Sequence, residues 1–521
     1  PAGVLCMATQ SLQYAAAFLE SRGLLLEETE ERGRHLIATR DHPPGTLLFQ
    51  EEPYVWMLLT SNNSHEERCH WCLGEAGEQK LQRCSSCKFA RYCCGDHQRK
   101  AWRRSHSTEC KRLARTLERM GRHPPTTALL IGRVMDERQR EKPTPSDGAV
   151  APASSFSGVT SLVDHWKRQP ADTLEGFTSV AAVARDYLSA LSDEQQSPVD
   201  VDMELVVKLL CRFAANNHTI CDHEYRPIGA GCYVLSGMVN HSCEPNTVQT
   251  FSGCRIGFRT LRPVRKGDEV TISYVDLAAT RQARLRDLER RYLFRCNCGR
   301  CTSPVDPSDH LKTALLCTKC AGAVCGLDRV CEDCGVGDED GELARRVEVV
   351  DSAIAAATHT PPEELEGAAW PRASALVSEQ TRAGGDMGVM RRDWQAAVDA
   401  VERALHPCNL RRLRVTEVAL ELCLREGAFA QALPLADASV KAYCAVYPSD
   451  SPLTALQHCL LGKLELNNEP PLLESAAKHF ERGLLVLRRS HGADNTLVRQ
   501  MEGMLRETTW AIQGQGAFDT K

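Results

Sequence analysis

The spacing of the cysteines constrains the fold of this chain more than any other feature. Eleven of its twenty-five cysteines stand in C-x-x-C or C-x-C pairs. Disulfides would explain them in a secreted protein, but the first residues lack the basic region and long apolar core of a signal peptide. Cysteine pairs within a chain of 521 residues instead indicate zinc thiolates in a reducing compartment. We therefore expect several zinc-stabilised modules and a location in the cytoplasm, the nucleus or both.

The first group of ligand pairs lies within residues 69–110. Zinc takes four ligands in a tetrahedron, and each close pair can supply half a site from one turn of chain. Eight side chains therefore predict two zinc ions: Cys69, Cys72, Cys84, Cys87, Cys93, His97, His106 and Cys110. Cys94 is the nearest alternative ligand.

Two further groups follow later in the chain. The C-x-C-x-x-C run of Cys296, Cys298 and Cys301 offers three thiolates, and a closed structural site needs a fourth ligand. Cys243, in the string NHSCEPN (240–246), is a candidate for it. The last group has the spacing of a zinc ribbon and predicts one more zinc on Cys317, Cys320, Cys331 and Cys334, with Cys325 as a spare thiol.

Between the cysteine groups, the chain alternates short strands with helices. Residues 21–56 and 227–275 show apolar runs broken by turn residues, and the second of these ends in GDEVTISYVD, which predicts an alternating strand. Residues 170–216 and the region after 341 show helical periodicity, and the latter resembles tetratricopeptide-like helical hairpins. Ordinary bundle helices would give a similar pattern. The stretch PTPSDGAVAPASSFSG (143–158) predicts an exposed linker.

Charge gives little indication of a partner. The net charge of −5 gives no global reason to bind nucleic acid or an acidic membrane, and no apolar run approaches 18 residues. Locally, residues 80–112 contain ten Lys or Arg residues and only two acidic residues. That segment could meet an acidic peptide or nucleic-acid phosphates, but a solvated face of a zinc module is an equal explanation.

Several motifs resemble one enzyme family. YCCGDHQRKAWRRSHSTEC is similar to the second half of a MYND zinc finger. NHSCEPN, TISYVD and RRYLFRCNCGRC resemble the C-terminal half of a SET domain and its post-SET zinc cluster, and ERGRHLIATRDHPPGTLLFQEEP resembles the opening SET strands. The order of these blocks is that of the SET and MYND protein-lysine methyltransferases. Two departures are His97, where the finger usually has Cys, and one extra residue between Trp102 and His106.

The resemblance implies an α+β multidomain fold in which a β-rich SET domain is split by a MYND finger and followed by an all-α, tetratricopeptide-like C-terminal domain. It implies interleaved ligand pairs in the finger and a post-SET zinc on Cys243, Cys296, Cys298 and Cys301. The expected blocks are 1–68 (N-terminal helix and first SET half), 69–110 (finger), 111–226 (helical insertion with linker), 227–276 (second SET half), 277–304 (post-SET cluster), 305–340 (ribbon-like segment) and 341–521 (helical domain).

The resemblance also implies a function, the transfer of a methyl group from S-adenosylmethionine to a lysine of a histone or another protein. Tyr274 is the expected catalytic tyrosine, and Tyr292 and His218 would line the lysine channel. The expected cofactor-binding residues are Arg32, Gly33, Arg34, Asn216, Asn240, His241, Tyr274 and Phe294. The string NHSCEPN would then have two roles, since Asn240 and His241 face the cofactor while Cys243 binds zinc.

Two histidines leave an alternative open. His35 stands where the family has a second glycine, so it would restrict φ and add bulk. His218 stands where some relatives place a channel aromatic. If these residues impair the site, the chain would be an adaptor that binds peptides through its finger and helical domain. A zinc-dependent nucleic-acid binder is the weakest alternative. A monomer that contacts no membrane is expected in each case.

Overall fold

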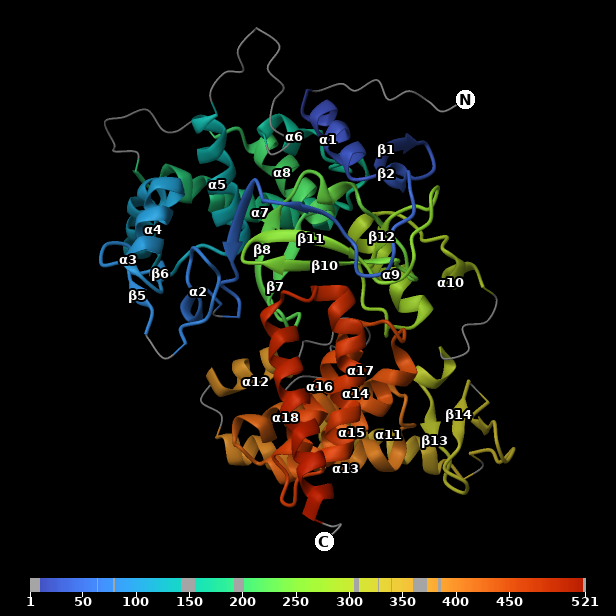
Figure 1. Cartoon of the computed structure of the whole chain (residues 1–521). Coiled ribbons are helices and arrows are strands. Elements are labelled where there is room, and N and C mark those ends of the chain that lie inside the picture. The colour runs from blue at the N-terminus through green and yellow to red at the C-terminus, as the bar shows by residue number, and fades with distance from the viewer. Residues whose placement is uncertain are drawn as a thin grey trace. The chain divides into compact units, whose positions relative to one another are not determined.

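The computed structural model describes residues 10–62, 64–77, 80–141, 155–191, 201–303, 309–326, 328–338, 340–358, 373–382 and 386–518 (Figure 1). Most of the predicted linker, 143–158, lies outside these residues. The chain forms two compact units. Unit 1 contains Pro1–His241, Pro245–Ile272 and Glu289–Phe294, and unit 2 contains Ser242–Glu244, Ser273–Leu288 and Arg295–Lys521. Every helix among the described residues is too short or too polar to span a lipid bilayer.

Unit 1 is built around short strands that join distant parts of the sequence. Strand order is β10–β11–β3 in one sheet and β4–β8–β7 in another, β1 pairs with β2, and β9 pairs in parallel with β12. Strands that precede the finger therefore pair with strands that follow residue 217. The bounds are β1 Leu24–Thr29, β2 Gly33–Ala38, β3 Leu47–Glu51, β4 Val55–Leu58, β7 His218–Cys221, β8 Pro227–Cys232, β9 Asn240–His241, β10 Thr247–Ser252, β11 Arg255–Thr260 and β12 Thr271–Ile272.

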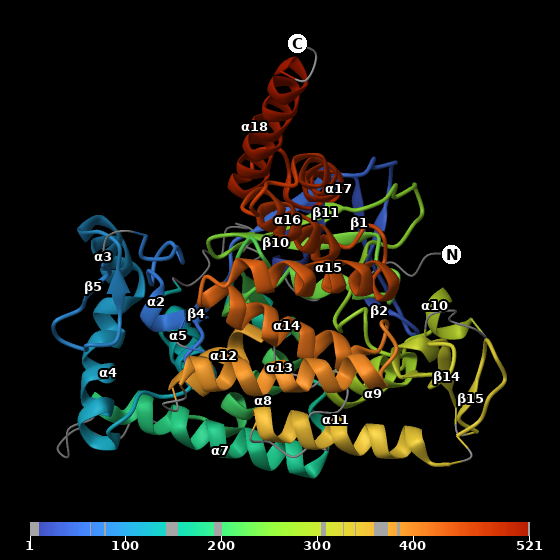
Figure 2. The ribbon, with the colours of Figure 1, turned by 90° about the horizontal axis from the view of Figure 1, so that it is seen from below.

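Helices of unit 1 pack beside these strands: α5 contacts both β4 and α7, and α7 contacts α8 (Figure 2). In α8, Val206, Leu209, Leu210 and Phe213 are buried at helical spacing, and the Asp202 carboxylate caps the first turn by accepting from the Leu205 N–H at 3.0 Å. The bounds are α1 Gln10–Ser21, α5 Thr126–Arg140, α6 Phe156–Ser161, η2 Trp166–Arg168, α7 Ala171–Leu188, η3 Ser189–Leu191, α8 Met203–Asn216 and η4 Ser236–Met238.

The finger region contains one irregular helical turn that explains a departure seen in the sequence. Residues Trp102–His106 form a π-helical turn, η1, between α3 and α4. A π turn accommodates one more residue than an α turn. The extra residue before His106 is thus absorbed within a continuous helix. The elements are α2 Ser64–Glu67, β5 Gln82–Arg83, β6 Arg91–Tyr92, α3 Gly95–Ala101, η1 and α4 Ser107–Met120.

Unit 2 combines a three-stranded ribbon, in the order β13–β14–β15, with a succession of helices in which each of α13 to α17 contacts the next one along the chain. Trp394 is fully buried in the largest apolar cluster of this unit. The bounds are α9 Arg281–Tyr292, which runs from unit 2 into unit 1, α10 Gly299–Thr302, η5 His310–Lys312, β13 Leu315–Leu316, β14 Ala323–Cys325, β15 Val330–Cys331, α11 Glu342–Thr358, α12 Ala373–Arg382, α13 Met387–Ala404, α14 Leu410–Arg425, α15 Phe429–Val446, α16 Pro452–Leu466, α17 Leu473–His491 and α18 Thr496–Phe518.

The strand predicted from GDEVTISYVD is shorter than its alternating pattern suggested. Only Thr271 and Ile272 form β12. Beyond them, the Ser273 hydroxyl donates to the Val275 carbonyl at 2.7 Å. A short polar side chain that bonds its own backbone competes with a strand ladder, and here it ends the strand.

Candidate cofactor-binding surface and zinc centres

The loop NHSCEPN is fastened to β12 at both ends. Asn240 and His241 form β9 and pair in parallel with Thr271 and Ile272. At the other end, the Asn246 side chain accepts from the Thr271 N–H at 2.9 Å and donates to the Glu269 carbonyl at 2.8 Å. The two asparagines therefore hold the loop against one strand, and the role of Asn246 was not predicted from the sequence.

A buried carboxylate fixes the turn that leads into this loop. Glu51, at the end of β3, accepts from the Leu235 N–H at 2.9 Å and from the Ser236 N–H at 2.8 Å. Burial raises the pKa of Glu51, and the bonds from Ser236 and Leu235 oppose that rise. Phe49 and Glu51 are both buried, and their spacing of two residues, which places side chains on one face of a strand, is a signal in the sequence that could have identified Glu51.

Asn240 also connects the loop to the turn between β1 and β2. Its side-chain nitrogen donates to the Arg32 carbonyl at 3.0 Å and to a Glu269 carboxylate oxygen at 3.1 Å, and Arg32 and Glu269 form an ion pair at 3.0 Å. Gly33 has a φ of +61°, and a Cβ there would meet nothing within 4 Å. The turn is thus ordered by side chains but open at its glycine, as a backbone that approaches a ligand must be. Arg34 instead donates to the Ser161 carbonyl at 2.9 Å.

An aromatic surface lies beside the same loop. The rings of His241 and Phe294 are 6.0 Å apart at an angle of 56°, and both side chains are half-buried. Leu293 has a φ of +59°, and Arg168 donates to its carbonyl. The chain thereby turns out of α9, whose last residue is Tyr292, and sets Phe294 against the loop.

Asn216 and His218 lie deeper than the loop. The Asn216 side-chain nitrogen donates to the Val163 carbonyl at 2.7 Å and to the Arg212 carbonyl at 2.8 Å, so its two N–H groups have partners within the protein. The His218 ring is buried edge-on against aromatic side chains, and its Nδ1 lies 2.8 Å from the Gln249 carboxamide oxygen. Burial lowers the pKa of His218, so the ring is neutral at pH 7.

The restriction of φ expected at His35 does not arise. His35 lies in β2 and does not belong to the described non-glycine residues of positive φ. Its ring is buried, with Nδ1 2.9 Å from the Gly33 carbonyl oxygen. The side chain is therefore folded against its own strand, while the left-handed position of the turn is occupied by Gly33.

The eight ligands of the finger form two groups of four. Tetrahedral ligands about 2.0–2.3 Å from one zinc are about 3.3–3.8 Å from each other. Cys87 Sγ lies 3.7 Å from His106 Nε2, and Cys84 Sγ lies 3.7 Å from Cys110 Sγ. The two groups are Cys69, Cys72, Cys93 and His97, and Cys84, Cys87, His106 and Cys110. This is the interleaved grouping that the resemblance implied, and Cys94 is exposed and belongs to neither group.

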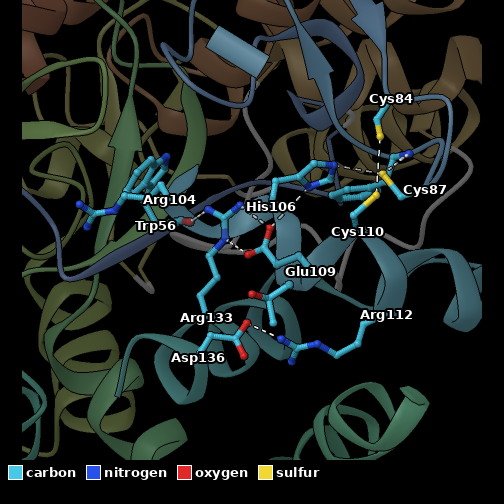
Figure 3. Close-up of polar contacts among 12 residues, drawn as sticks. Trp56, Cys84, Cys87, Arg104, His106, Glu109, Cys110, Arg112, Arg133 and Asp136 are labelled. Atoms are coloured by element: carbon cyan, nitrogen blue, oxygen red, sulfur yellow. Dashed lines mark hydrogen bonds and ion pairs between the residues drawn. The ribbon is translucent and has the colours of Figure 1, made fainter. Parts of the chain in front are cut away.

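A buried charge network supports the second finger site (Figure 3). His106 Nδ1 lies 3.9 Å from a Glu109 carboxylate oxygen, and Arg133 binds that carboxylate through two nitrogens, one of them at 3.1 Å. Arg133 also donates to the carbonyl of Trp56 in β4. Burial would raise the pKa of Glu109, but Arg133 and His106 more than offset it, so the pKa lies below its ordinary value. A carboxylate behind a ligating histidine fixes the orientation of the imidazole ring.

Two more groups of four cysteines lie in unit 2. Cys243 comes within 3.5 Å of Cys301, sulfur to sulfur, and the ribbon sulfurs of Cys320 and Cys331 are 3.4 Å apart. These spacings fit tetrahedral zinc. The groups are Cys243, Cys296, Cys298 and Cys301, and Cys317, Cys320, Cys331 and Cys334.

Comparison with known proteins places this geometry in context. The family model of the SET domain matches residues 33–275. Mouse histone-lysine N-methyltransferase SMYD3 is 27% identical over 482 residues, which cover 92% of this chain and 96% of the relative. Histone-lysine N-methyltransferase ASHR1 of Arabidopsis thaliana is 27% identical over 504 residues, 94% and 96% of the two chains. Bovine N-lysine methyltransferase SMYD2 is 29% identical over 273 residues, 52% of this chain and 58% of that protein.

Proposed function

We propose that this chain, which belongs to the SET-domain proteins, is an S-adenosylmethionine-dependent protein-lysine N-methyltransferase. It is homologous to the SMYD proteins over most of its length. The observation that carries this proposal is the parallel pairing of β9 with β12. It sets the Asn240 and His241 loop beside the strand that leads, two residues later, to Tyr274. The proposed cofactor residues and the strand before the proposed catalytic tyrosine would then lie on two paired segments of backbone.

The cofactor fits the residues that surround the loop. The open glycine at position 33 allows close approach of a ligand to the backbone, and the half-buried Phe294 ring offers a face for an adenine base. The Asn240 carboxamide oxygen is not used in the two bonds donated by its nitrogen, so it can accept from the ligand's ammonium group. When bound, S-adenosylmethionine supplies a methyl group activated by a sulfonium.

The protein's part in the reaction is to hold a neutral lysine amine in line with that methyl group. A lysine has a reference pKa of about 10.4, so a desolvated channel that lowers it favours the nucleophilic form. We assign orientation of the amine to the Tyr274 hydroxyl, and the channel walls to Tyr292 and the neutral His218 ring. Alignment of the reacting atoms supplies much of the remaining rate enhancement. The proposed substrate is a lysine of a histone or another protein.

Structural observations favour the enzyme over the adaptor that the sequence left open. The adaptor depended on impairment of the site by His35 and His218. The His35 ring is folded onto the Gly33 carbonyl, and the His218 ring packs edge-on against aromatic side chains. Within the basic segment 80–112, Arg112 is buried against Asp136 and so does not contribute to an exposed basic face. A nucleic-acid role loses support accordingly, whereas peptide binding by the finger stays a prediction. The described cysteines form no disulfide, and many of them stand in four groups suited to zinc, a use of cysteine typical of the reducing cytoplasm and nucleus that we propose as the location.

Calorimetric titration of S-adenosylmethionine into the zinc-loaded protein tests the proposal. We expect binding that Asn240→Ala and Phe294→Ala weaken and that Tyr274→Phe retains, while Tyr274→Phe lowers methyl transfer to a substrate protein by about 100-fold or more. Asn467→Ala, in the exposed loop after α16, is the control for loss of an asparagine. Absence of cofactor binding by folded, zinc-loaded wild-type protein would contradict the methyltransferase assignment.

A further inference from the structure

The two faces of the ribbon strands carry different chemistry. Val324 in β14 is paired with Cys331 in β15, so both side chains point to the face that holds the four ribbon cysteines and a small apolar cluster. Cys325, the next residue, points to the opposite face. Glu332 follows Cys331, so its side chain points to the same face as Cys325. The Glu332 N–H donates to the Ala323 carbonyl at 2.9 Å, which continues the pairing with β14. A thiol and a carboxylate therefore stand diagonally across the strands, outside the ribbon's own zinc group.

A third potential ligand comes from the short helix η5. His310 Nε2 lies 3.4 Å from a Glu332 carboxylate oxygen, and the Cys325 thiol donates to the His310 carbonyl at 3.7 Å. The ligand atoms of these three side chains all lie within 4.8 Å of one another. Zinc ligands are separated by about 3.3–3.8 Å, so small rotations of exposed side chains would close the set. None of the three residues belongs to the four groups described above.

We propose that His310, Cys325 and Glu332 bind one further Zn²⁺ ion through three protein ligands and leave its fourth position to water. The donor set selects the metal: imidazole and thiolate suit zinc, whereas magnesium and calcium require oxygen ligands. The thiolate and the carboxylate together balance the charge of the ion. Three ligands with an open position differ from the closed sets of four in the ribbon and the finger, which are structural in type.

Exposure determines how such a site behaves. The side chains of His310 and Glu332 are 41% and 47% exposed. A chelator or a second ligand can therefore reach the ion, and we expect it to exchange faster than the ions of the four-ligand groups. The ion would also connect two segments, because Asp309, beside His310, accepts the Arg281 N–H at the start of α9. Metal binding would tie the start of α9 to the ribbon.

The test uses the full zinc-loaded chain, dialysed until its zinc content is constant and then titrated with Zn²⁺ in competition with a chromophoric chelator. We expect one additional equivalent to bind. Cys325→Ser and Glu332→Gln should each weaken that equivalent by at least about 100-fold, since loss of an outer partner alone costs 10–100-fold. Their zinc content after dialysis should equal that of the wild type, which reports that the ribbon is intact.

Cobalt gives a second, spectroscopic measurement that reports whether a thiolate is among the ligands. Co²⁺ added to the dialysed protein should produce a thiolate-to-metal charge-transfer band that Cys325→Ser abolishes. Cys94→Ser removes an exposed cysteine outside all the groups and should change neither titration nor spectrum. Failure of the wild type to bind another equivalent, or an unchanged titration and spectrum in Cys325→Ser, would overturn the proposal. The proposal does not depend on methyl transfer.

Discussion

Replacement of Glu109 by Gln tests how strongly the finger is built into unit 1. The Glu109 and Arg133 side chains are only 3% and 10% exposed, so the substitution leaves the arginine charge buried without its carboxylate partner. Breaking a buried pair in this way costs about 3–5 kcal/mol. Arg133 keeps its bond to the Trp56 carbonyl, which places the expected loss at about 3 kcal/mol, the lower end of that range. The zinc affinity of the His106 site should also fall by about 10–100-fold.

Zinc release into a chromophoric chelator at increasing urea concentration measures this loss. Release is preferable to a global spectroscopic signal, because a chain of two units need not unfold in one step. Glu118→Gln, on the exposed side of the same helix α4, is the matched control and should change little. The double variant Glu109→Gln/Arg133→Met should recover part of the loss, since it removes the uncompensated charge. Equal zinc release from Glu109→Gln and Glu118→Gln would refute the reasoning.

Three further predictions concern other parts of the chain. Burial, with neighbouring His479, lowers the pKa of His458 to about 4. Because the unfolded chain takes up this proton near pH 6.5, unit 2 should be fully stabilised above pH 6.5 and lose at most about 3 kcal/mol as the pH falls towards 4. His458→Gln should flatten that part of the profile in thermal unfolding at a series of pH values, and an unchanged slope would contradict it. Asn246→Ala removes two bonds to backbone and should lower the unfolding free energy by about 1–3 kcal/mol, measured by denaturant titration. Cys243→Ser should release one zinc equivalent, counted by metal analysis, and retention of that zinc would exclude Cys243 as a ligand.

Local patterns were the most predictable part of this molecule. Zinc ligands in C-x-x-C pairs lie in one turn of chain, so their spacing alone indicates a half-site. The structure brings the half-sites together in four groups, of which the interleaving in the finger and the group with Cys243 were implied by the family resemblance. Short strands and amphipathic helices follow from periodicity in the same way. The strand predicted from GDEVTISYVD was too long, because the alternating pattern does not reveal that the Ser273 side chain bonds to nearby backbone.

Partners distant in sequence could not be predicted by the same reasoning. Glu51 holds backbone groups at Leu235 and Ser236, more than 180 residues away, and Arg133 reaches back to Trp56. Each bond depends on which strands become neighbours, and that is decided by the packing of the whole unit. The polar residue types were visible in the sequence, but their partners were not.

The geometry of the loop NHSCEPN gives a reason why a proposed metal ligand and proposed cofactor residues share one short string. Both ends of the loop are fixed to the same strand, Asn240 through the β9–β12 pairing and Asn246 through its side chain. The residues between these two points therefore form a loop whose two ends cannot move apart. Cys243 lies in the middle of this loop, where the loop is not paired with β12. A zinc ion bound by Cys243 together with Cys296, Cys298 and Cys301 would therefore restrain this middle part. Loss of this zinc would first loosen residues 242–245 while the β9–β12 pairing of Asn240 and His241 persists. The side chains next to the loosened segment would then be held less firmly, and cofactor affinity should fall at chelator concentrations that leave the fold of unit 1 intact.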